Sequence, residues 1–381
     1  MKSVFTSILF FAYAFSFAQE SRVEEPPSSQ EIDRLIHTYQ FSKALLLLNR
    51  VEDSLSVDVH QRKGYCYFQL GNYGDAIRQF ENVMKLDSIN THALFQLGQL
   101  YARNKQYGEA YACYEKLISS DTLNSFYYKQ YAIVASQANA PIISLSNFFQ
   151  AVKLNPRDIE AYALLGDVLL EADQYDIADS LLTQALTLNL SSQLRLLLAK
   201  AQLGEGKYED VIRTTEQLMV KGDTLPAYAR LLGISYFQLD KFDKVIPCMD
   251  FLLKNELKAE WIYYYLGVSY QRMNEQDSAI VYLNKAIEEG ISENISNYYA
   301  QLATSYETIR DFKSAIKYYK AAYESSKRDI LLYHLGCSYD VYYKDKAPAI
   351  AYFKRYLNSH DTIKVAREYT RHRLNELEFY R

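Results

Sequence analysis

Residues 231–246 read LLGISYFQLDKFDKVI, a stretch that places small and aromatic side chains at helical spacing. Gly233 and Tyr236 are three residues apart, and Phe242 and Val245 are again three residues apart. Because residues three or four apart lie on one face of an α-helix, each pair predicts a helix. The segment LDK between them predicts a tight turn, so the stretch is interpreted as a helix–turn–helix unit.

Small residues recur along the chain at near-constant intervals, which indicates an internal repeat. The series that contains Gly233 has nine members, 33 to 36 residues apart, and a second small residue follows each member about twelve positions later. The first series consists of Gly64, Gly98, Ala132, Gly166, Ala199, Gly233, Gly267, Ala303 and Gly336.

Glycine within a helix costs about 0.5–1 kcal/mol relative to alanine, so six of the 13 glycines at one repeat position require a packing reason. We expect the two helices of a unit to approach closely where the small residues cross. In residues 231–246, Gly233 and Val245 would make room, and Tyr236 and Phe242 would fill the groove beside them.

This pattern resembles the tetratricopeptide repeat (TPR), a 34-residue helix–turn–helix unit with small and aromatic residues at set positions. Residues 57–90 match it with Gly64, Tyr67, Ala76 and Phe80. The resemblance covers about residues 30–358. It implies an all-α fold, a right-handed TPR superhelix or α-solenoid, with about nine full repeats, a degenerate leading repeat and a C-terminal capping helix.

The sequence predicts five segments along the chain. Their order is a signal peptide, a linker, the degenerate leading repeat, the nine repeats and a polar-faced helix that caps the end of the solenoid. The corresponding ranges are residues 1–18, 19–29, 30–56, 57–358 and 359–381.

The first residues, MKSVFTSILFFAYAFSFA, have the pattern of an export signal. Lys2 supplies the positive charge, an apolar run follows, and Ser16 and Ala18 form a small-residue cleavage site. The run is too short and too polar for a membrane anchor, which needs about 20 apolar residues. We therefore expect an exported bacterial protein, periplasmic or secreted, without a stable membrane anchor in the mature chain.

Charge and cysteine content narrow the classes of partner and of fold. The formal net charge is −4 and no basic stripe is present, so nucleic acid is not an expected partner. The four cysteines are scattered and form no CxxC pair, and they are interpreted as buried thiols rather than as a disulfide framework.

No catalytic motif is found in the sequence. It contains no HExxH, GxSxG or glycine-rich phosphate loop. His360 and His372, with Asp361 and Glu368, are interpreted as a solvated helix face. The sequence therefore predicts no enzyme, no cofactor, no metal site and no catalytic residue.

The family resemblance implies a concave groove, lined by the first helix of each repeat, that takes a partner protein or peptide. Residues expected in this lining are Phe95, Lys129, Arg230, Phe237, Trp261 and Tyr264. The last four are favoured because Trp, Tyr and Arg carry much of the binding energy at interfaces. The alternative is that these aromatic side chains pack against neighbouring helices.

The groove lacks the Lys and Asn pairs with which co-chaperones of this family hold a terminal carboxylate. Gln61, Tyr65, Phe95 and Gln99 stand at those positions. The predicted function is a non-catalytic exported scaffold or adaptor. The alternatives are a glycan- or peptidoglycan-associated binding module of the cell envelope, and a sensor that acts through a separate partner.

Overall fold

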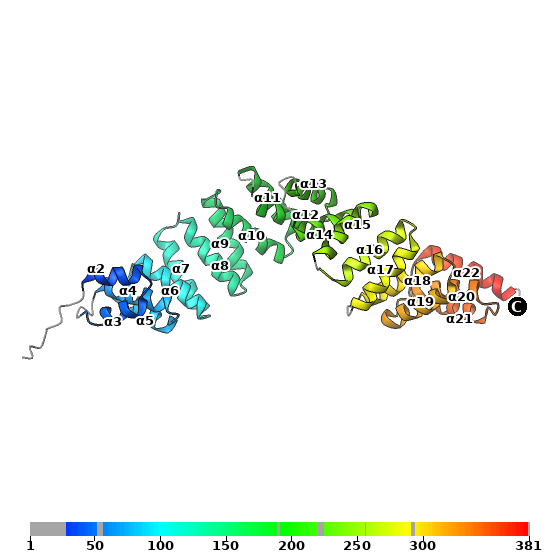
Figure 1. Cartoon of the computed structure of the whole chain (residues 1–381), viewed down its shortest axis with the longest axis horizontal. Helices are drawn as coiled ribbons and strands as arrows, with labels where there is room; N and C mark the ends of the chain where they lie inside the picture. The colour runs from blue at the N-terminus through cyan, green and yellow to red at the C-terminus, as the bar shows by residue number, and fades with distance from the viewer. Residues whose placement is uncertain are drawn as a thin grey trace, which may run out of the picture. The chain divides into compact units, whose positions relative to one another are not determined.

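The computed structural model describes residues 28–51, 56–188, 191–219, 225–255, 257–290 and 294–379. In these ranges the regular structure consists of 21 α-helices and no strand, which confirms the predicted all-α fold (Figure 1). The predicted signal peptide and nearly all of the predicted linker lie outside the described residues. Two compact units, residues 1–156 and 157–381, are described separately.

The first unit is a series of antiparallel helix pairs, and each helix packs against the next one in the chain. The first helix of a pair is called helix A and the second helix B. The pairs are α2 (Ser29–His37) with α3 (Phe41–Leu48), α4 (Val57–Gln69) with α5 (Tyr73–Leu86), α6 (Thr91–Arg103) with α7 (Tyr107–Ser120), and α8 (Ser125–Gln137) with α9 (Pro141–Leu154).

The second unit continues the same scheme of consecutive helix packing and ends with an unpaired helix, α22 (Lys364–Phe379). Its pairs are α10 (Ile159–Glu171) with α11 (Tyr175–Leu188), α12 (Ser192–Gly204) with α13 (Tyr208–Met219), α14 (Pro226–Gln238) with α15 (Phe242–Lys254), α16 (Glu260–Arg272) with α17 (Gln276–Glu289), α18 (Ile295–Thr308) with α19 (Phe312–Ser326), and α20 (Ile330–Tyr342) with α21 (Ala347–Leu357).

Polar N-cap residues start the A helices of the first five full repeats, at the repeat interval. Ser56, Asn90, Asn124, Asp158 and Ser191 each accept a hydrogen bond from a backbone N–H in the first turn of the helix that follows. Such caps satisfy N–H groups that have no partner within the helix, and each stabilises it by roughly 1 kcal/mol. These capping residues thus mark where one helix pair ends and the next begins.

The turn from helix A to helix B also repeats. In the α2–α3 pair and in the first eight full repeats, one residue of this turn has a left-handed backbone, with φ between 54° and 77°, whereas the turn from α20 to α21 has none. Only two of the eight residues in these full repeats are glycines. They are Gly71, Lys105, Asn139, Asp173, Gly206, Asp240, Asn274 and Arg310.

The small residues of the first series provide close approach. A Cβ atom added to Gly233 would clash with the Met249 methyl carbon. Met249, which the sequence did not single out, thus packs over Gly233. The space above the glycine is filled by the large residue four positions after the second small residue, as Phe80 does over Gly64.

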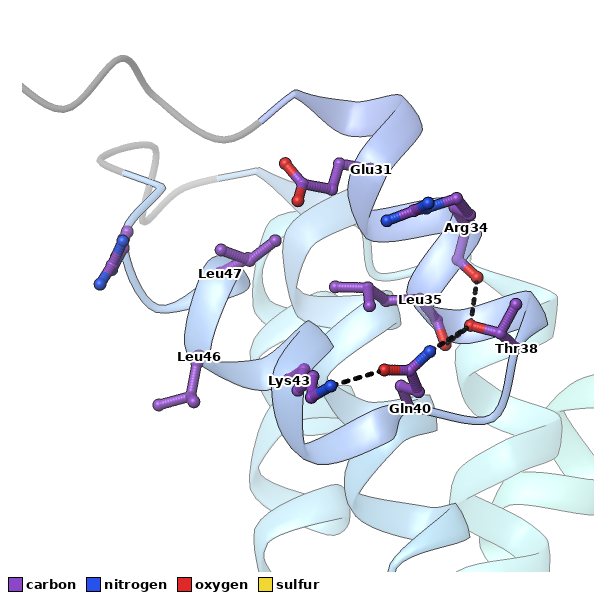
Figure 2. A pocket seen from close by; sticks show the side chains of 9 residues that line it. Glu31, Arg34, Leu35, Thr38, Gln40, Lys43, Leu46 and Leu47 are labelled. Atoms are coloured by element: carbon purple, nitrogen blue, oxygen red, sulfur yellow. Dashed lines mark hydrogen bonds between the residues drawn. The ribbon is translucent and has the colours of Figure 1, made fainter.

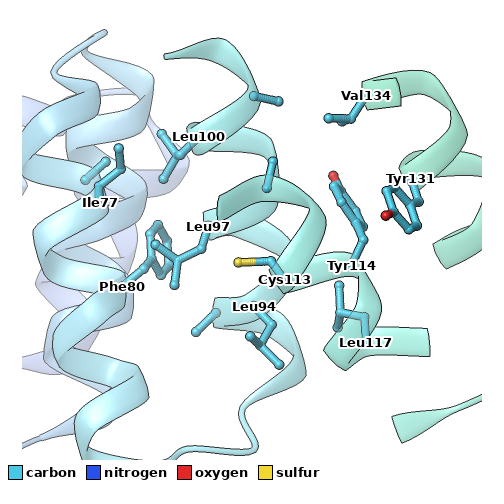
Figure 3. Close-up of a cluster of buried hydrophobic side chains, with 14 of the residues drawn as sticks. Ile77, Phe80, Leu94, Leu97, Leu100, Cys113, Tyr114, Leu117, Tyr131 and Val134 are labelled. Carbon is cyan, nitrogen blue, oxygen red and sulfur yellow. The ribbon is translucent and has the colours of Figure 1, made fainter. Parts of the chain in front are cut away.

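In the first unit one core cluster runs across consecutive helix pairs. In the first unit Phe80 and Leu97 are buried together, and the rings of Tyr114 and Tyr131 are stacked with centroids 5.9 Å apart (Figure 3). Each of these side chains belongs to a different helix, so no pair buries its apolar face alone. This dependence on neighbours is typical of repeat architectures.

The last helix, α22, is held to the preceding pair by polar contacts. The Arg373 guanidinium donates to the Asp340 carboxylate at 2.7 Å, and Arg367 donates to the Leu357 carbonyl at 2.7 Å near the end of α21. Thr370 and Leu374 are buried beneath the helix. A largely polar helix thus covers the apolar side of α20 and α21.

The four cysteines are free thiols, and burial raises the pKa of Cys66, Cys113 and Cys248 to about 11. They are therefore protonated near neutral pH and act as small apolar side chains. Separately, we find that the described helices include none with the length and apolar character needed to cross a bilayer.

Candidate partner-binding surface

Four residues expected to bind a partner come together on the A helices of the second unit. The guanidinium carbon of Arg230 on α14 lies 5.3 Å from the centre of the Trp261 ring on α16. Phe237 and Tyr264 join the same group through Tyr265, whose ring centroid lies 4.5 Å from that of Phe237 and 6.1 Å from that of Tyr264. Residues far apart in sequence therefore form one continuous cluster.

Two members of this cluster were not anticipated from the sequence. Tyr265 also contacts Trp261 edge to face at 5.9 Å, and Tyr298 on α18 lies 5.0 Å from Tyr264. Both tyrosines stand outside the repeat positions that were expected to line the groove, although the run of three tyrosines after Trp261 was visible. We call the six residues Arg230, Phe237, Trp261, Tyr264, Tyr265 and Tyr298 the Trp261 cluster.

The cluster is graded from exposed to buried. Arg230 is exposed, Trp261 is half-buried, and Tyr298 is buried. Burial raises the pKa of Tyr264 and of Tyr265, so both phenols stay neutral near pH 7, although the positive charge of Arg230 acts in the opposite direction on Tyr265. Contacts between helices thus account for the burial of Tyr264 and Tyr298, whereas Arg230 is exposed to solvent and Trp261 is partly exposed.

A groove adjoins the Trp261 cluster, with a volume of about 650 Å³. It is formed by α12, α14, one residue of α15, the start of α16 and the turn before it. Its lining combines apolar side chains with three cations and includes both Arg230 and Trp261. The lining residues are Leu196, Lys200, Leu203, Pro226, Ala227, Arg230, Leu231, Ile234, Leu252, Leu257, Lys258, Ala259, Trp261 and Ile262.

Phe95 and Lys129, the other two expected lining residues, belong to the first unit. Phe95 contacts Phe126 with ring centroids 5.3 Å apart, and the Phe126 side chain is 43% exposed. Lys129 is buried, with only 8% of its surface exposed. A small aromatic surface is present on α6 and α8, and Lys129 offers little of its side chain to a ligand there.

A second hollow, of about 460 Å³, lies between α2 and α3 and contains none of the expected residues (Figure 2). Its floor is a chain of hydrogen bonds in which Lys43 donates to Gln40 at 2.9 Å, Gln40 to Thr38 at 3.1 Å and Thr38 to the Arg34 carbonyl at 2.8 Å. These polar groups are already paired with one another. The hollow is open and has no apolar anchor comparable to Trp261.

The acidic, histidine and cysteine side chains do not gather into a metal-binding arrangement. Among the described residues no group of three or more His, Cys, Asp or Glu side chains is placed to hold a metal ion. His372 is exposed and lies 3.4 Å from Glu376, one turn further along α22, as in an ordinary surface pair.

Models of the tetratricopeptide repeat family match four segments, residues 67–130, 159–191, 262–289 and 296–329. The chain belongs to the tetratricopeptide repeat proteins. Members of this family generally bind protein partners and generally have no catalytic activity. A comparison with curated proteins gave no match.

Solved tetratricopeptide repeat structures and related proteins resemble the chain at low identity. A tetratricopeptide repeat protein from Parabacteroides merdae is 18% identical, with a TM-score of 0.45 over 65% of this chain and 98% of that one. MamA from Desulfovibrio magneticus is 20% identical, with a TM-score of 0.40 over 43% and 93%. PilF from Pseudomonas aeruginosa is 17% identical, with a TM-score of 0.41 over 58% and 97%.

The family places the Trp261 cluster in context. Arg230 and Trp261 lie on the A helices of the sixth and seventh repeats, respectively, counted from the repeat that contains α4. The surface of helix A is the one expected to receive partners in tetratricopeptide repeat proteins. The cluster and the groove beside it are therefore the candidate site of this chain.

Proposed function

We propose that this tetratricopeptide repeat protein is a non-catalytic scaffold that binds a partner protein or peptide on the A helices of its fifth to seventh repeats. The observation that carries the proposal is the pairing of exposed Arg230 with half-buried Trp261 at the edge of a groove of about 650 Å³. Trp and Arg in a partly desolvated setting are the residue types that most often dominate the energy of binding.

The geometry of the pair favours binding over a purely structural role. Arg230 is exposed and makes no ion pair within the described residues, yet its guanidinium lies over the Trp261 ring in a cation–π contact. This contact orders a long side chain before a partner arrives. Preordering of this kind lowers the entropy cost of binding.

Affinity capture after crosslinking, in cells that make the protein naturally, tests the proposal. The full chain and its Trp261→Ala variant are compared, and we expect one or more proteins captured by the first to be reduced at least tenfold with the second. Tyr342→Ala is the matched control, because Tyr342 is an exposed aromatic on another A helix of the same unit, outside the cluster.

Two results would count against partner binding at this site. One is equal capture by both chains, provided that circular dichroism shows the Trp261→Ala chain to be folded. The other is retention of the full chain on cell-wall polysaccharide with no captured protein, which would favour a glycan-binding module in place of a protein scaffold.

We also propose that the protein is exported and acts in the periplasm or outside the cell, without nucleic acid as a partner. The support is the signal-like sequence of residues 1–18 and the formal charge of −4. Mass spectrometry of the protein recovered from the native cell tests the export. We expect a chain that begins at Gln19, whereas an intact N-terminus on all of the protein would contradict it.

A further inference from the structure

The groove beside the Trp261 cluster is positively charged. Lys200 on α12, Arg230 on α14 and Lys258 in the turn before α16 all line it and are all exposed. No acidic side chain is among its described lining residues. In a chain with a formal charge of −4, three cations around one groove make a local exception.

Several other cations of the second unit form ion pairs, whereas these three do not. Lys207 pairs with Asp179 at 2.6 Å, and Arg373 pairs with Asp340 at 2.7 Å. Within the described part of the chain, Lys200, Arg230 and Lys258 have no carboxylate within 4 Å. Their charges are thus available to a ligand.

Two described carboxylates, Asp167 and Glu260, stand beside members of this lining without entering it. Burial raises the pKa of Asp167, and the charge of Lys200 acts against that rise, so these two groups sense each other without forming an ion pair. Glu260, next to Trp261 in sequence, accepts a hydrogen bond from the Tyr298 hydroxyl at 3.1 Å. Neither carboxylate lines the groove.

The A helices at the groove also begin differently from those before them. Leu225 and Ala259 are the N-cap residues of α14 and α16, and neither forms a side-chain cap, whereas Ser191 caps α12. The first N–H groups of a helix carry partial positive charge. The start of α14, which has no acidic residue in its first turn, therefore adds to the field of the three cations, whereas Glu260 in the first turn of α16 opposes it.

The rest of the lining is apolar. Leu196, Ile234 and Trp261 line the groove, and Leu257 remains 44% exposed at its rim. A volume of about 650 Å³ lies within the range of about 300–1,000 Å³ typical of ligand pockets, and it exceeds the volume of one large side chain. The groove can thus accept more than one apolar group in addition to an anion.

We propose that the groove binds an acidic segment of the partner protein, in which bulky apolar side chains insert between α12, α14 and α16 while neighbouring carboxylates pair with Lys200, Arg230 and Lys258. This inference rests on the proposed function and names the chemistry of its partner. An apolar anchor distinguishes such a peptide from a simple anion or a sugar acid, which would use the cations and leave Leu196, Ile234 and Leu257 uncovered.

A random dodecapeptide phage library, panned on the immobilised full chain, tests the chemistry although the partner itself is unidentified. We expect the enriched sequences to carry Asp or Glu next to Leu, Phe or Trp and to be poor in Lys and Arg. Absence of any enrichment overturns the proposal, and so does enrichment of neutral or basic sequences.

The best enriched peptide is then synthesised with a fluorescent label, and its affinity is measured by fluorescence polarisation. For the double variant Lys200→Gln with Lys258→Gln, which keeps most of each side chain's length, we expect affinity to fall about tenfold, since each pair on an exposed surface contributes modestly. Lys241→Gln is the control, because Lys241 is an exposed lysine in the turn between α14 and α15, outside the groove. Equal affinity of the double variant and the control overturns the proposal.

Two further measurements distinguish a peptide ligand from other anions, and failure of this proposal from failure of the proposed scaffold function. Vesicles rich in phosphatidylserine, and heparin, should compete weakly with the peptide, and strong competition by either contradicts a peptide site. Neutral peptides that depend on Trp261 would leave the scaffold function in place and remove only the acidic partner. Capture that is indifferent to Trp261→Ala would remove the scaffold site itself.

Discussion

The ring of Phe80 lies so close over the backbone of Gly64 that a Cβ atom added there would stand 2.8 Å from it. The same relationship recurs at Gly336, where the added atom would stand 2.5 Å from the ring of Phe353. In both cases helix A comes close to helix B because the glycine has no side chain. The aromatic residue and the glycine are therefore one packing unit.

Gly64→Ala should destabilise the protein by about 1–2 kcal/mol, because the Phe80 ring is fully buried and has to shift to admit a methyl group. The midpoint of urea unfolding, followed by circular dichroism, measures the change. Gly74→Ala is the control, since a Cβ atom at Gly74 meets nothing within 4 Å and alanine is the better helix former. Equal effects of the two changes would contradict the packing explanation.

The left-handed residues of the turns between helix A and helix B lead to a second prediction. Substitutions at two equivalent turn positions should change the stability of the protein in opposite directions. Gly71 has φ 77° and Lys105 has φ 60°, and a left-handed backbone costs a non-glycine residue roughly 1–2 kcal/mol. Gly71→Ala should therefore destabilise the protein by about 1 kcal/mol, although nothing lies within 4 Å of the added atom. Lys105→Gly should stabilise it slightly, because relief of strain exceeds the entropy that glycine adds to the unfolded chain.

Urea unfolding of both variants, measured side by side, tests whether the two changes in stability have opposite signs. A loss of stability in Lys105→Gly as large as that in Gly71→Ala would mean that the Lys105 side chain makes stabilising contacts that outweigh its backbone strain. Asp240 and Arg310 occupy the same turn position and offer independent replicates.

The periodicity of small residues was enough to predict the helix pairs, because close approach of two helices requires small residues at fixed positions in the sequence. The left-handed turn position has no such requirement for one residue type. Lys105 and Arg310 adopt the conformation that favours glycine, since closure of the helix pair determines the backbone there regardless of residue type. The side chain that packs over Gly233 was missed for a related reason, because Met249 is not aromatic and its role depends on packing rather than on residue class.

The candidate site was only partly accessible from sequence. Helical spacing placed Arg230 and Trp261 on neighbouring A helices, and the structure brings them within 5.3 Å. The burial of Lys129 and the contribution of Tyr298 could not be anticipated. Both depend on how consecutive pairs are rotated against each other, which a pattern within one repeat does not specify.

Two buried tyrosines at the same repeat position differ in their hydroxyl contacts and give a third prediction. Tyr114 is fully buried, and its hydroxyl has no hydrogen-bond partner among the described residues. The Tyr319 hydroxyl donates to the Glu307 carboxylate at 2.9 Å and lies 3.1 Å from the Thr304 hydroxyl. Burial is also the main cause of the raised pKa of both phenols, so each is neutral.

Tyr319→Phe should destabilise the protein by about 1–2 kcal/mol, because it removes the 2.9 Å hydrogen bond to the Glu307 carboxylate and leaves it with the longer one from the Ser338 hydroxyl at 3.3 Å. Tyr114→Phe should be neutral or should stabilise it by up to about 1 kcal/mol, since it removes a buried polar atom without breaking a bond. Each variant is the control for the other, as both keep the ring in place. Similar losses in the two variants would indicate that the Tyr114 hydroxyl is satisfied by an ordered water molecule.

The attachment of α22 predicts a dependence of stability on pH. Burial by itself would raise the pKa of Asp340, but hydrogen bonds from Arg373 and Lys346 outweigh burial and lower it below the ordinary value. A carboxyl whose pKa is lower in the folded state contributes stability above its unfolded pKa of about 3.9, and loses that contribution as the pH falls through the folded value. Acid below about pH 4 should therefore loosen the attachment of α22.

Asp340→Asn should destabilise the protein by about 2 kcal/mol at pH 7, because the two cations lose a charged acceptor. The difference from the natural chain should shrink as the pH falls below about 4, because Asp340 itself then becomes protonated. Urea unfolding across this range, with hydrogen exchange to localise the effect to α22, measures both. Glu368→Gln on the exposed side of α22 is the control, and a difference at Asp340 that stays constant with pH would show that its charge does not hold the helix.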